Sequence, residues 1–379
     1  MDISWRRRRG QSQGFPHPTY KEVRAGENAI HLFSYGRDLY DAMLDAIDSA
    51  KESVYLESFI WKGDAVGKDF KEHLARKASQ GVAVYVVFDW FGNLVVPTAF
   101  KRFPHPIHCL DYRGIRRPMN LLDPRHYALE HRKLLVVDGR IGFLGGYNLG
   151  SLYATEWRDT HLRVEGPAAA QLAQVFADFW NGKVGSGERI TRHYPRRFDP
   201  LFVSHDNDAA RLAFPIRDMY ISAIDRAEHH VHLTNAYFVP DRVLLATLIA
   251  AARRGVDVQV LLPKRSNHIL ADWAGQGRLA ACLEAGIRIF LYKAMIHAKT
   301  CTVDGQWSTI GTANLDRLSS VGNLEINAEI YSRELAEHMD DLFEHDKSFA
   351  TELSLASWSA RAWPDKLGER ILAPMRIFI

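Results

Sequence analysis

The stretch of the chain from residue 131 to 148 reads HRKLLVVDGRIGFLGGYN, and the stretch from 297 to 314 reads HAKTCTVDGQWSTIGTAN. The two align without a gap. Each begins with His and has Lys two residues later, Asp seven, Gly eight and fourteen, and Asn seventeen residues later. Matching polar and glycine positions in two long segments indicate an internal duplication, which has to be recognised before a fold is assigned.

The similarity continues outside these two segments. AIDSAKESVYL (46–56) resembles AIDRAEHHVHL (223–233), and ARKASQGVAVYVV (75–87) resembles AAARRGVDVQVLL (250–262). A segment with helical periodicity follows each motif, at 169–180 and at 334–345. Each half is therefore expected to run helix, strand, helix, strand, hairpin, helix, and such alternation favours an α/β sheet covered on both faces.

Length and composition fit two domains with large cores, since 47% of the 379 residues are hydrophobic. The segment 184–208 is rich in Gly, Pro, Ser and charge without periodicity, which is typical of a linker. We expect a basic N-terminal arm over 1–25, a first domain over 26–190, a linker over 191–210 and a second domain over 211–379. The arm carries four arginines and is either a solvated tail or an electrostatic anchor to anionic lipid.

The net charge of +3 is too small for a dedicated nucleic-acid binder and fits an anionic substrate or an anionic membrane surface. Three scattered cysteines predict a reducing compartment. No apolar run approaches the ~18–20 residues of a membrane span, and the N-terminus does not have the pattern of a signal peptide.

The doubled motif predicts a site for a tetrahedral anion. Alternation along a strand puts the His and the Lys of each copy on one face, and the hairpin returns each Asn to the His end. Two such halves meeting with pseudo-twofold symmetry would form a phosphate cage in which one His attacks phosphorus and the other protonates the leaving oxygen. The cage residues are His131, Lys133, Asn148, His297, Lys299 and Asn314.

Two pairs of carboxylates accompany the histidines. Asp159 and Glu325 each lie 28 residues after the His of their copy, and each is expected to hold the far imidazole nitrogen and fix its tautomer. Asp138 and Asp304 fall at the hairpin turns, where hydrogen bonds to local backbone are the expected role.

These residues resemble the phospholipase D superfamily, whose motif is HxKxxxxD with a downstream GxxN, and the resemblance runs from about residue 25 to the end. FDWFGN (88–93), GGYNLG (145–150), LTNAYFVPD (233–241) and NLD (314–316) resemble the bacterial cardiolipin synthases of the shorter branch without N-terminal spans. One departure is Leu318, which stands where many members have Arg. The resemblance implies tandem α/β sandwich domains, a site at their interface, a phosphohistidine intermediate, Asp138 and Asp304 as catalytic motif residues, and neither metal nor cofactor.

The expected reaction is a phosphatidyl transfer, in which His131 takes the phosphatidyl group of phosphatidylglycerol, glycerol leaves, and a second phosphatidylglycerol accepts the group to give cardiolipin. The alternatives are a phosphodiesterase acting on phospholipid or nucleic acid with water as acceptor, and a non-catalytic membrane scaffold. We expect a monomer without nucleic-acid partners, peripheral on the cytoplasmic side of a bacterial cell membrane.

The segment WFGNLVVPTAFKRF (90–103) either dips into the bilayer or is a buried strand end followed by a surface loop. Strand ends face the cleft in α/β sheets, so Trp61, Trp90, Phe91 and Tyr237 are expected to line an apolar substrate groove. No cluster of His, Cys and carboxylate at metal-ligand spacing is apparent elsewhere in the sequence.

Overall fold

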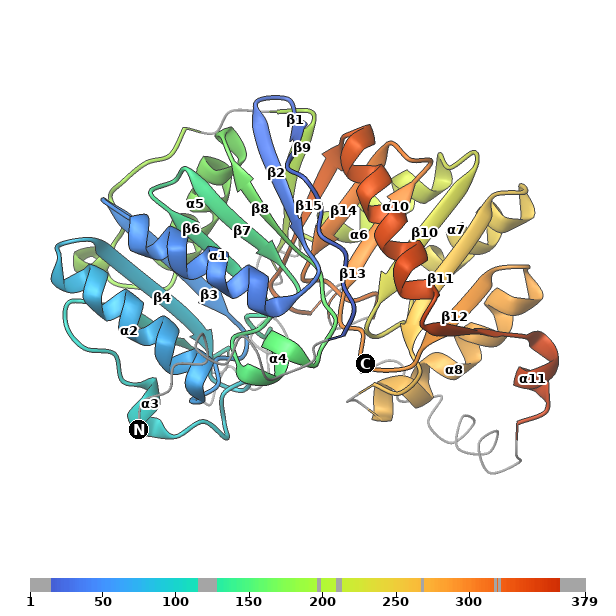
Figure 1. Cartoon of the computed structure of the whole chain (residues 1–379), viewed down its shortest axis with the longest axis horizontal. Coiled ribbons are helices and arrows are strands. Elements are labelled where there is room, and N and C mark those ends of the chain that lie inside the picture. The colour runs from blue at the N-terminus through green and yellow to red at the C-terminus, as the bar shows by residue number, and fades with distance from the viewer. Residues whose placement is uncertain are drawn as a thin grey trace. The chain divides into compact units, whose positions relative to one another are not determined.

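The computed structural model describes residues 15–114, 128–195, 199–208, 213–266, 269–316, 319 and 322–361. The chain divides between Ser204 and His205 into two compact units (Figure 1). Residues 1–14 of the predicted N-terminal arm and Leu318 lie outside the described residues. Residues 23–25 of that arm form a strand that pairs with the strand Asn28–Phe33 (β2), and its Val23 and Ala25 side chains are buried.

The first unit is built around an eight-stranded mixed sheet with the order β1-β2-β8-β7-β6-β3-β4-β5. β3, β4 and β5 run parallel to one another, whereas the β6–β7 hairpin is antiparallel to its neighbours. Its strands are β1 Val23–Ala25, β2 Asn28–Phe33, β3 Ser53–Ser58, β4 Ala83–Asp89, β5 His108–Tyr112, β6 Leu134–Val137, β7 Ile141–Gly145 and β8 His161–Glu165. Its helices are α1 Gly36–Ser49, α2 Ala65–Ser79, α3 Thr98–Lys101, α4 Ser151–Thr155 and α5 Pro167–Asn181, followed by a 3-10 turn at Ser186–Glu188.

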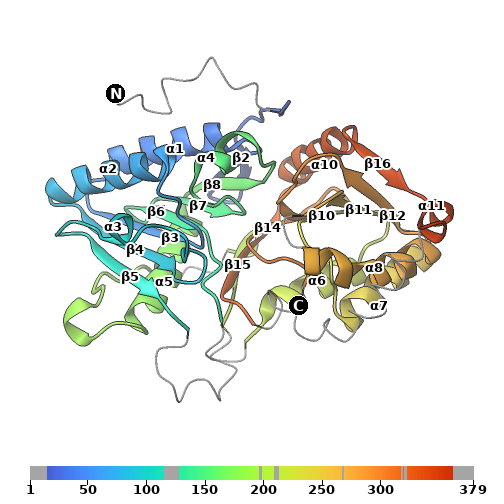
Figure 2. The same cartoon turned by 90° about the horizontal axis from the view of Figure 1, so that it is seen from below.

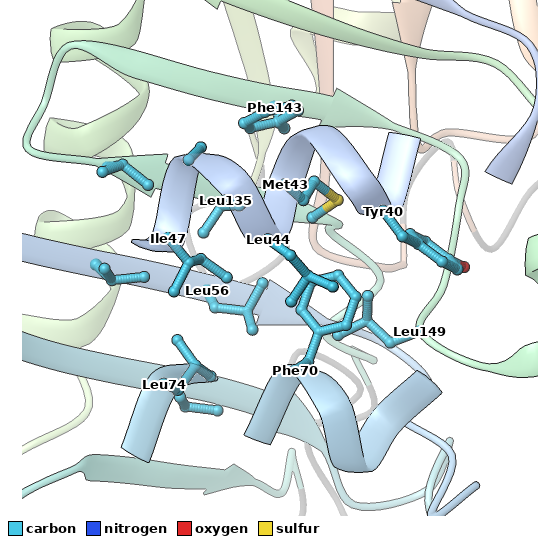
Figure 3. Close-up of a cluster of buried hydrophobic side chains, with 14 of the residues drawn as sticks. Tyr40, Met43, Leu44, Ile47, Leu56, Phe70, Leu74, Leu135, Phe143 and Leu149 are labelled. Atoms are coloured by element: carbon cyan, nitrogen blue, oxygen red, sulfur yellow. The ribbon is translucent and has the colours of Figure 1, made fainter. Parts of the chain in front are cut away.

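Helices cover both faces of this sheet. α1 and α2 lie side by side on one face and α5 covers the other (Figure 2). Helical spacing of apolar residues explains the packing of α1, because Met43, Leu44 and Ile47 all point into a core shared with β3, β6, β7 and α2 (Figure 3). Each of these side chains contributes about 1.5–3 kcal/mol through burial.

The second unit repeats this plan around a sheet with the order β16-β12-β11-β10-β13-β14-β15-β9. Figure 2 shows α6, α7 and α8 on one face of the sheet and α10 on the other. Its strands are β9 Phe202–Asn207, β10 His230–Asn235, β11 Asp257–Pro263, β12 Arg288–Tyr292, β13 Lys299–Val303, β14 Trp307–Gly311, β15 Glu325–Tyr331 and β16 Ala350–Leu353. Its helices are α6 Pro215–Asp225, α7 Arg242–Arg253, α8 Ile269–Glu284, α10 Arg333–Lys347 and α11 Leu355–Ser359.

The two strand orders match element by element. β2-β8-β7-β6-β3-β4-β5 corresponds to β9-β15-β14-β13-β10-β11-β12, and only the edge strands β1 and β16 have no counterpart. The predicted duplication and the predicted α/β class are therefore confirmed. The sequence did not predict the short strands β5, β8, β12 and β15, and part of the stretch expected to be a linker forms the edge strand β9.

Candidate functional site

In the first unit, the motif His and Lys lie just before β6 rather than inside it. β6 begins at Leu134, which pairs with Glu57 near the end of β3, so the ladder stops there and the predicted placement of His131 and Lys133 within a strand is wrong. The Lys133 ammonium donates to the His131 carbonyl at 2.5 Å. The ring of Phe59 meets the His131 imidazole edge to face at 4.8 Å and lies 5.3 Å from the Lys133 nitrogen.

In the second unit, the motif His also lies before the strand, but the motif Lys lies within it. Lys299 opens β13, and its ammonium donates to the His297 carbonyl and lies 2.9 Å from Nδ1 of the same imidazole. The ring of Tyr237 meets His297 edge to face at 6.2 Å, so this predicted pocket residue does lie against the motif.

Both motifs concentrate buried positive charge. Lys133 and Lys299 are 2% and 0% exposed, and His131 and His297 are 8% and 4% exposed. A buried ammonium is strongly unfavourable unless negative groups or a bound anion compensate it. Such burial in both copies is what a site for an anionic substrate requires.

The two motif asparagines are also buried. Asn148 Oδ1 accepts from the backbone N–H of Ile60 at 3.1 Å, which ties the end of the hairpin to the segment that follows β3 and carries Phe59. Asn314 Oδ1 has no hydrogen-bond partner among the described residues. An unpaired buried acceptor costs about 1–3 kcal/mol, which a hydroxyl of a bound substrate would recover.

Asp138 and Asp304 occupy the far end of each hairpin, on the other side of β6 or β13 from the histidine. Each adopts positive φ, as does the glycine after it, which is the geometry of a type I′ hairpin turn. Each carboxylate accepts three backbone N–H bonds, from residues 51–53 or from residues 228–230. Burial would raise the pKa of Asp304, but these donors outweigh it and hold the pKa below its ordinary value.

The predicted hydrogen bonds of the motif aspartates to local backbone are confirmed. Four strand residues at about 3.3 Å each separate each aspartate from the motif lysine, and the catalytic role that the resemblance implies for them stays a prediction.

A buried ion cluster that the sequence did not reveal holds the segment around His131. The Arg132 guanidinium donates to Glu130 at 2.8 and 2.9 Å and to Glu57 at 3.1 Å, and these side chains are at most 3% exposed. The backbone N–H of Glu130 donates to Asp89 at 2.9 Å. Burial raises the pKa of Asp89 to about 6, although backbone donors partly oppose it.

The second unit holds the same segment by apolar packing. Ile296 and Ala298 stand at the positions of Glu130 and Arg132, and both are completely buried beside Phe290 and Phe343. The two halves therefore position equivalent histidines by different physical means.

The two carboxylates predicted to pair with the histidines lie at the starts of equivalent strands: Asp159 comes two residues before β8 begins, and Glu325 is the first residue of β15. Asp159 Oδ1 accepts from the Thr160 N–H at 2.7 Å, and Glu325 Oε2 accepts from the Thr312 hydroxyl at 2.6 Å. Their predicted hydrogen bonds to the imidazoles stay a prediction. The pKa of Asp316 is raised to about 7, because burial and the Glu325 carboxylate together outweigh the opposing effect of the Ser319 donors and Lys299.

The expected groove residues have different surroundings. Trp61 is 2% exposed, and its indole N–H donates to the Gly67 carbonyl at 3.0 Å, so it is a core residue between β3 and α2 and not part of an open rim. Trp90 and Phe91 are 37% and 58% exposed, as residues that meet lipid would be.

Comparison with known proteins shows the family of the chain. The family model described as "Cardiolipin synthase, PLD-like domain" matches residues 43–180 and 220–347, one segment in each unit. The fold and the doubled motif thus define a phospholipase D-like protein. Within that class, the chain belongs to the cardiolipin synthase family.

Individual relatives support the assignment. The chain is 31% identical over 367 residues to "Cardiolipin synthase" of Listeria monocytogenes serotype 4a (strain HCC23), covering 92% of this chain and 76% of the relative. It is 32% identical over 362 residues to "Cardiolipin synthase 1" of Staphylococcus aureus (strain COL), covering 91% and 72%. A crystal structure of phosphatidylserine synthase from Haemophilus influenzae Rd KW20 matches with a TM-score of 0.68 at 13% identity, covering 95% and 94%, and so has the same fold.

Proposed function

We propose that this protein is a phosphatidyltransferase that converts two molecules of phosphatidylglycerol into cardiolipin and glycerol. The observation that carries the proposal is the pair of buried His-x-Lys motifs, one in each unit, in a chain of the cardiolipin synthase family. The exchange replaces one phosphodiester by another, so it needs no nucleotide.

The proposed reaction has two balanced steps. A nitrogen of His131 forms a bond to phosphorus while the bond from phosphorus to the glycerol oxygen breaks, and His297 gives its proton to that oxygen. His297 then takes the proton of the acceptor hydroxyl. The acceptor oxygen bonds to phosphorus as the phosphorus–nitrogen bond breaks, which returns His131 to its starting state.

The remaining motif residues have supporting roles in this proposal. Lys133 and Lys299 stabilise the negative charge on the non-bridging phosphate oxygens, and Asn148 and Asn314 contribute amide groups to the same region. Asp159 and Glu325 orient the two imidazoles. No metal takes part in the proposed chemistry.

We also propose that the protein works at an anionic membrane surface on the cytoplasmic side, as a monomer carrying both motifs. Among the described residues, no helix is long and apolar enough to cross a membrane. The three cysteines are unpaired thiols, which suits a reducing compartment. Contact with the bilayer is assigned to the apolar loop formed by residues 90–95, where four large side chains are exposed: Trp90 37%, Phe91 58%, Leu94 49% and Val95 83%.

This loop is held rigidly although its tips are exposed. The buried Asn93 side chain accepts from the backbone N–H of Trp61 and donates to the carbonyls of Phe59 and Asp89. The Lys101 ammonium donates to the Asn93 carbonyl. A fixed backbone that keeps apolar side chains in water is unfavourable for an isolated soluble protein and favourable for one that meets lipid. A basic residue lies beside the loop, since the guanidinium of the exposed Arg113 is 5.2 Å from the centre of the Trp90 ring.

The same scaffold connects the loop to the motif. Asp89 accepts from the loop N–H of Gly92 and from the N–H of Glu130, the residue before His131. A lipid headgroup held at the loop would therefore lie near the first motif. The alternative is a buried strand end followed by an ordinary surface loop. It accounts for the burial of Phe88, but it does not account for the four exposed apolar side chains that follow within seven residues.

Vesicle sedimentation tests the loop. The double variant Phe91→Ser/Val95→Ser should lose at least tenfold in binding to phosphatidylglycerol vesicles, and Leu201→Ser, which alters an apolar residue 39% exposed in the same unit, should not. Equal binding of both variants and the wild type would remove the loop from the membrane contact without affecting the proposed reaction.

Product analysis tests the reaction. Purified protein and phosphatidylglycerol vesicles should yield cardiolipin and glycerol in equal amounts, with phosphatidic acid a minor product, and added glycerol should drive the reaction backwards. Water is abundant, so transfer requires an acceptor hydroxyl held in line, which can be worth an effective molarity of about 10⁵ M or more. If phosphatidic acid dominates at every lipid density, the protein is instead a phospholipase.

A further inference from the structure

A second cluster of ionisable side chains lies in the second unit, on the strand whose His230 backbone N–H donates to Asp304 at 2.8 Å. His230 and His232 stand two residues apart on β10, so their side chains share one face of the sheet. α10 packs on β10 and places Asp340 between them. Asp340 Oδ2 lies 3.2 Å from His230 Nε2, and its Oδ1 lies 2.8 Å from His232 Nδ1.

We propose that His230, His232 and Asp340 form a binding site for a divalent transition-metal ion, with Zn²⁺ as the best-matched ion. One ligand atom from each residue lies within 4.8 Å of the other two. Two imidazole nitrogens and one carboxylate oxygen are a common zinc donor set, and they leave a fourth position for water. Imidazole donors disfavour Mg²⁺ and Ca²⁺, which prefer all-oxygen sites.

The spacing of the donors suits such an ion. Zinc binds nitrogen and oxygen at about 2.0–2.2 Å, which puts tetrahedral ligand atoms roughly 3.3 Å apart. His230 Nε2 lies 3.2 Å from Asp340 Oδ2 and His232 Nδ1 lies 2.8 Å from Oδ1, which is close to that value, and one ligand atom from each of the three residues lies within 4.8 Å of the other two. Binding replaces the protons that link the carboxylate to the imidazoles, and these protons pass to solvent.

Neighbouring groups orient the donors as an outer shell of a metal site does. The hydroxyl of Thr302, on the adjacent strand β13, donates to Asp340 Oδ1. The imidazole of His232 stacks on the ring of Phe343 at 4.6 Å with an interplanar angle of 2°, which restricts its rotation. The three ligand side chains are 27%, 12% and 21% exposed, so an ion can reach them from solvent.

The site would act on stability and not on the proposed phosphoryl chemistry. Its ligands join α10 to the central strand of the sheet, and a metal that binds only the folded state stabilises that junction. No local pattern marks the cluster, because Asp340 lies 108 residues after His232, and the expectation that no such group occurs outside the motif is wrong.

Calorimetric titration of chelator-treated full-length protein with Zn²⁺ alone tests the site. We expect one ion per chain and, at a hundredfold excess over the dissociation constant, a rise in melting temperature of about 5–10 °C. Asp340→Asn and His230→Gln should each weaken binding at least tenfold, whereas Asp341→Asn, the same change on the next residue of α10, should not. Cobalt should give tetrahedral absorption bands that Asp340→Asn abolishes.

Two further measurements separate this site from the motif. Turnover of phosphatidylglycerol should be unaffected by chelation, and His297→Ala should bind zinc as the wild type does. Zinc binding that survives Asp340→Asn, or that disappears in His297→Ala, would overturn the proposal, as would the lack of stoichiometric binding to the wild type.

Discussion

Replacing Arg132 by methionine tests how the first unit holds its histidine. The guanidinium makes three charge-assisted hydrogen bonds to the carboxylates of Glu130 and Glu57, and all three side chains are nearly inaccessible to water. Methionine retains much of the side-chain volume, so the change removes charge pairing more than packing. Breaking one side of a buried ion pair costs about 3–5 kcal/mol, a large part of the roughly 5–15 kcal/mol that stabilises a folded domain.

The predicted consequence for activity follows from the position of the cluster. Glu130 and Arg132 flank His131 directly, so a relaxed segment displaces the imidazole, and a shift of about 1 Å can cost 100-fold in rate. Urea unfolding should give a midpoint well below that of the wild type in the transition assigned to the first unit. Turnover of phosphatidylglycerol, measured below that transition, should fall by at least tenfold.

Two control variants make this prediction specific. Arg140→Met changes an exposed arginine of the same unit and should alter stability by no more than about 0.5 kcal/mol. The triple variant Arg132→Met/Glu57→Gln/Glu130→Gln removes the stranded carboxylate charges and should regain much of the lost stability. If Arg132→Met alone stays within about 1 kcal/mol of the wild type, the ion cluster does not hold the segment and the reasoning fails.

Three further predictions concern the motif and its surroundings. His131→Ala and His297→Ala should each reduce cardiolipin formation to below a few per cent, because the two groups act as one unit; higher residual activity in either variant would contradict the two-histidine reaction. Asp304→Ala removes the acceptor of three backbone bonds at a residue with positive φ, so its unfolding free energy should fall by about 1–3 kcal/mol, with a smaller loss for Asp304→Asn, as urea unfolding can measure. The folded-state pKa of Asp316, raised by burial to about 7 from 3.8, means that its stabilising contribution is complete below pH ~4 and is lost as the pH rises to 7; Asp316→Asn should therefore match the wild type near pH 4 and exceed it by up to about 4 kcal/mol above pH 7, and parallel stability curves would refute this.

The sequence was informative wherever the determining residues are close together in the chain. The Asp-Gly pair at residues 138–139 predicts a hairpin turn by its own backbone preferences, and the repeated spacing from His to Asn predicts two equivalent hairpins. Helix α1 could be predicted because its apolar residues recur on one face over several turns.

The parts that were missed depend on contacts between distant residues. Glu57 lies 75 residues before Arg132, so nothing in the local pattern marks HRK as the centre of a buried ion cluster. Trp61 follows a strand and looked like a cleft residue, but the start of α2 offers the Gly67 carbonyl to its indole and draws it into the core. Short strands such as β8 were missed because five residues carry too little periodicity to be recognised.

The hydrogen bonding of the His297 imidazole bears on which histidine attacks phosphorus. An ammonium group can only donate hydrogen bonds, so the Lys299 nitrogen at 2.9 Å makes His297 Nδ1 an acceptor. A neutral imidazole whose Nδ1 accepts has its proton on Nε2, and that nitrogen then has no lone pair with which to attack phosphorus. Lys133 and Lys299 each donate to the carbonyl of their own motif histidine.

This tautomer of His297 favours His131 as the nucleophile of the proposed reaction, which leaves His297, once protonated, as the expected proton donor of the first step. Acid quenching during turnover, followed by peptide mapping, should recover the phosphatidyl group on His131. The variant His297→Ala should still form this adduct with a phosphatidyl donor whose leaving group needs no protonation, such as a p-nitrophenyl ester, whereas His131→Ala should not. Recovery of the group on His297 would show that its tautomer does not decide the roles, because the imidazole bonded by Lys299 would then be the one that attacks.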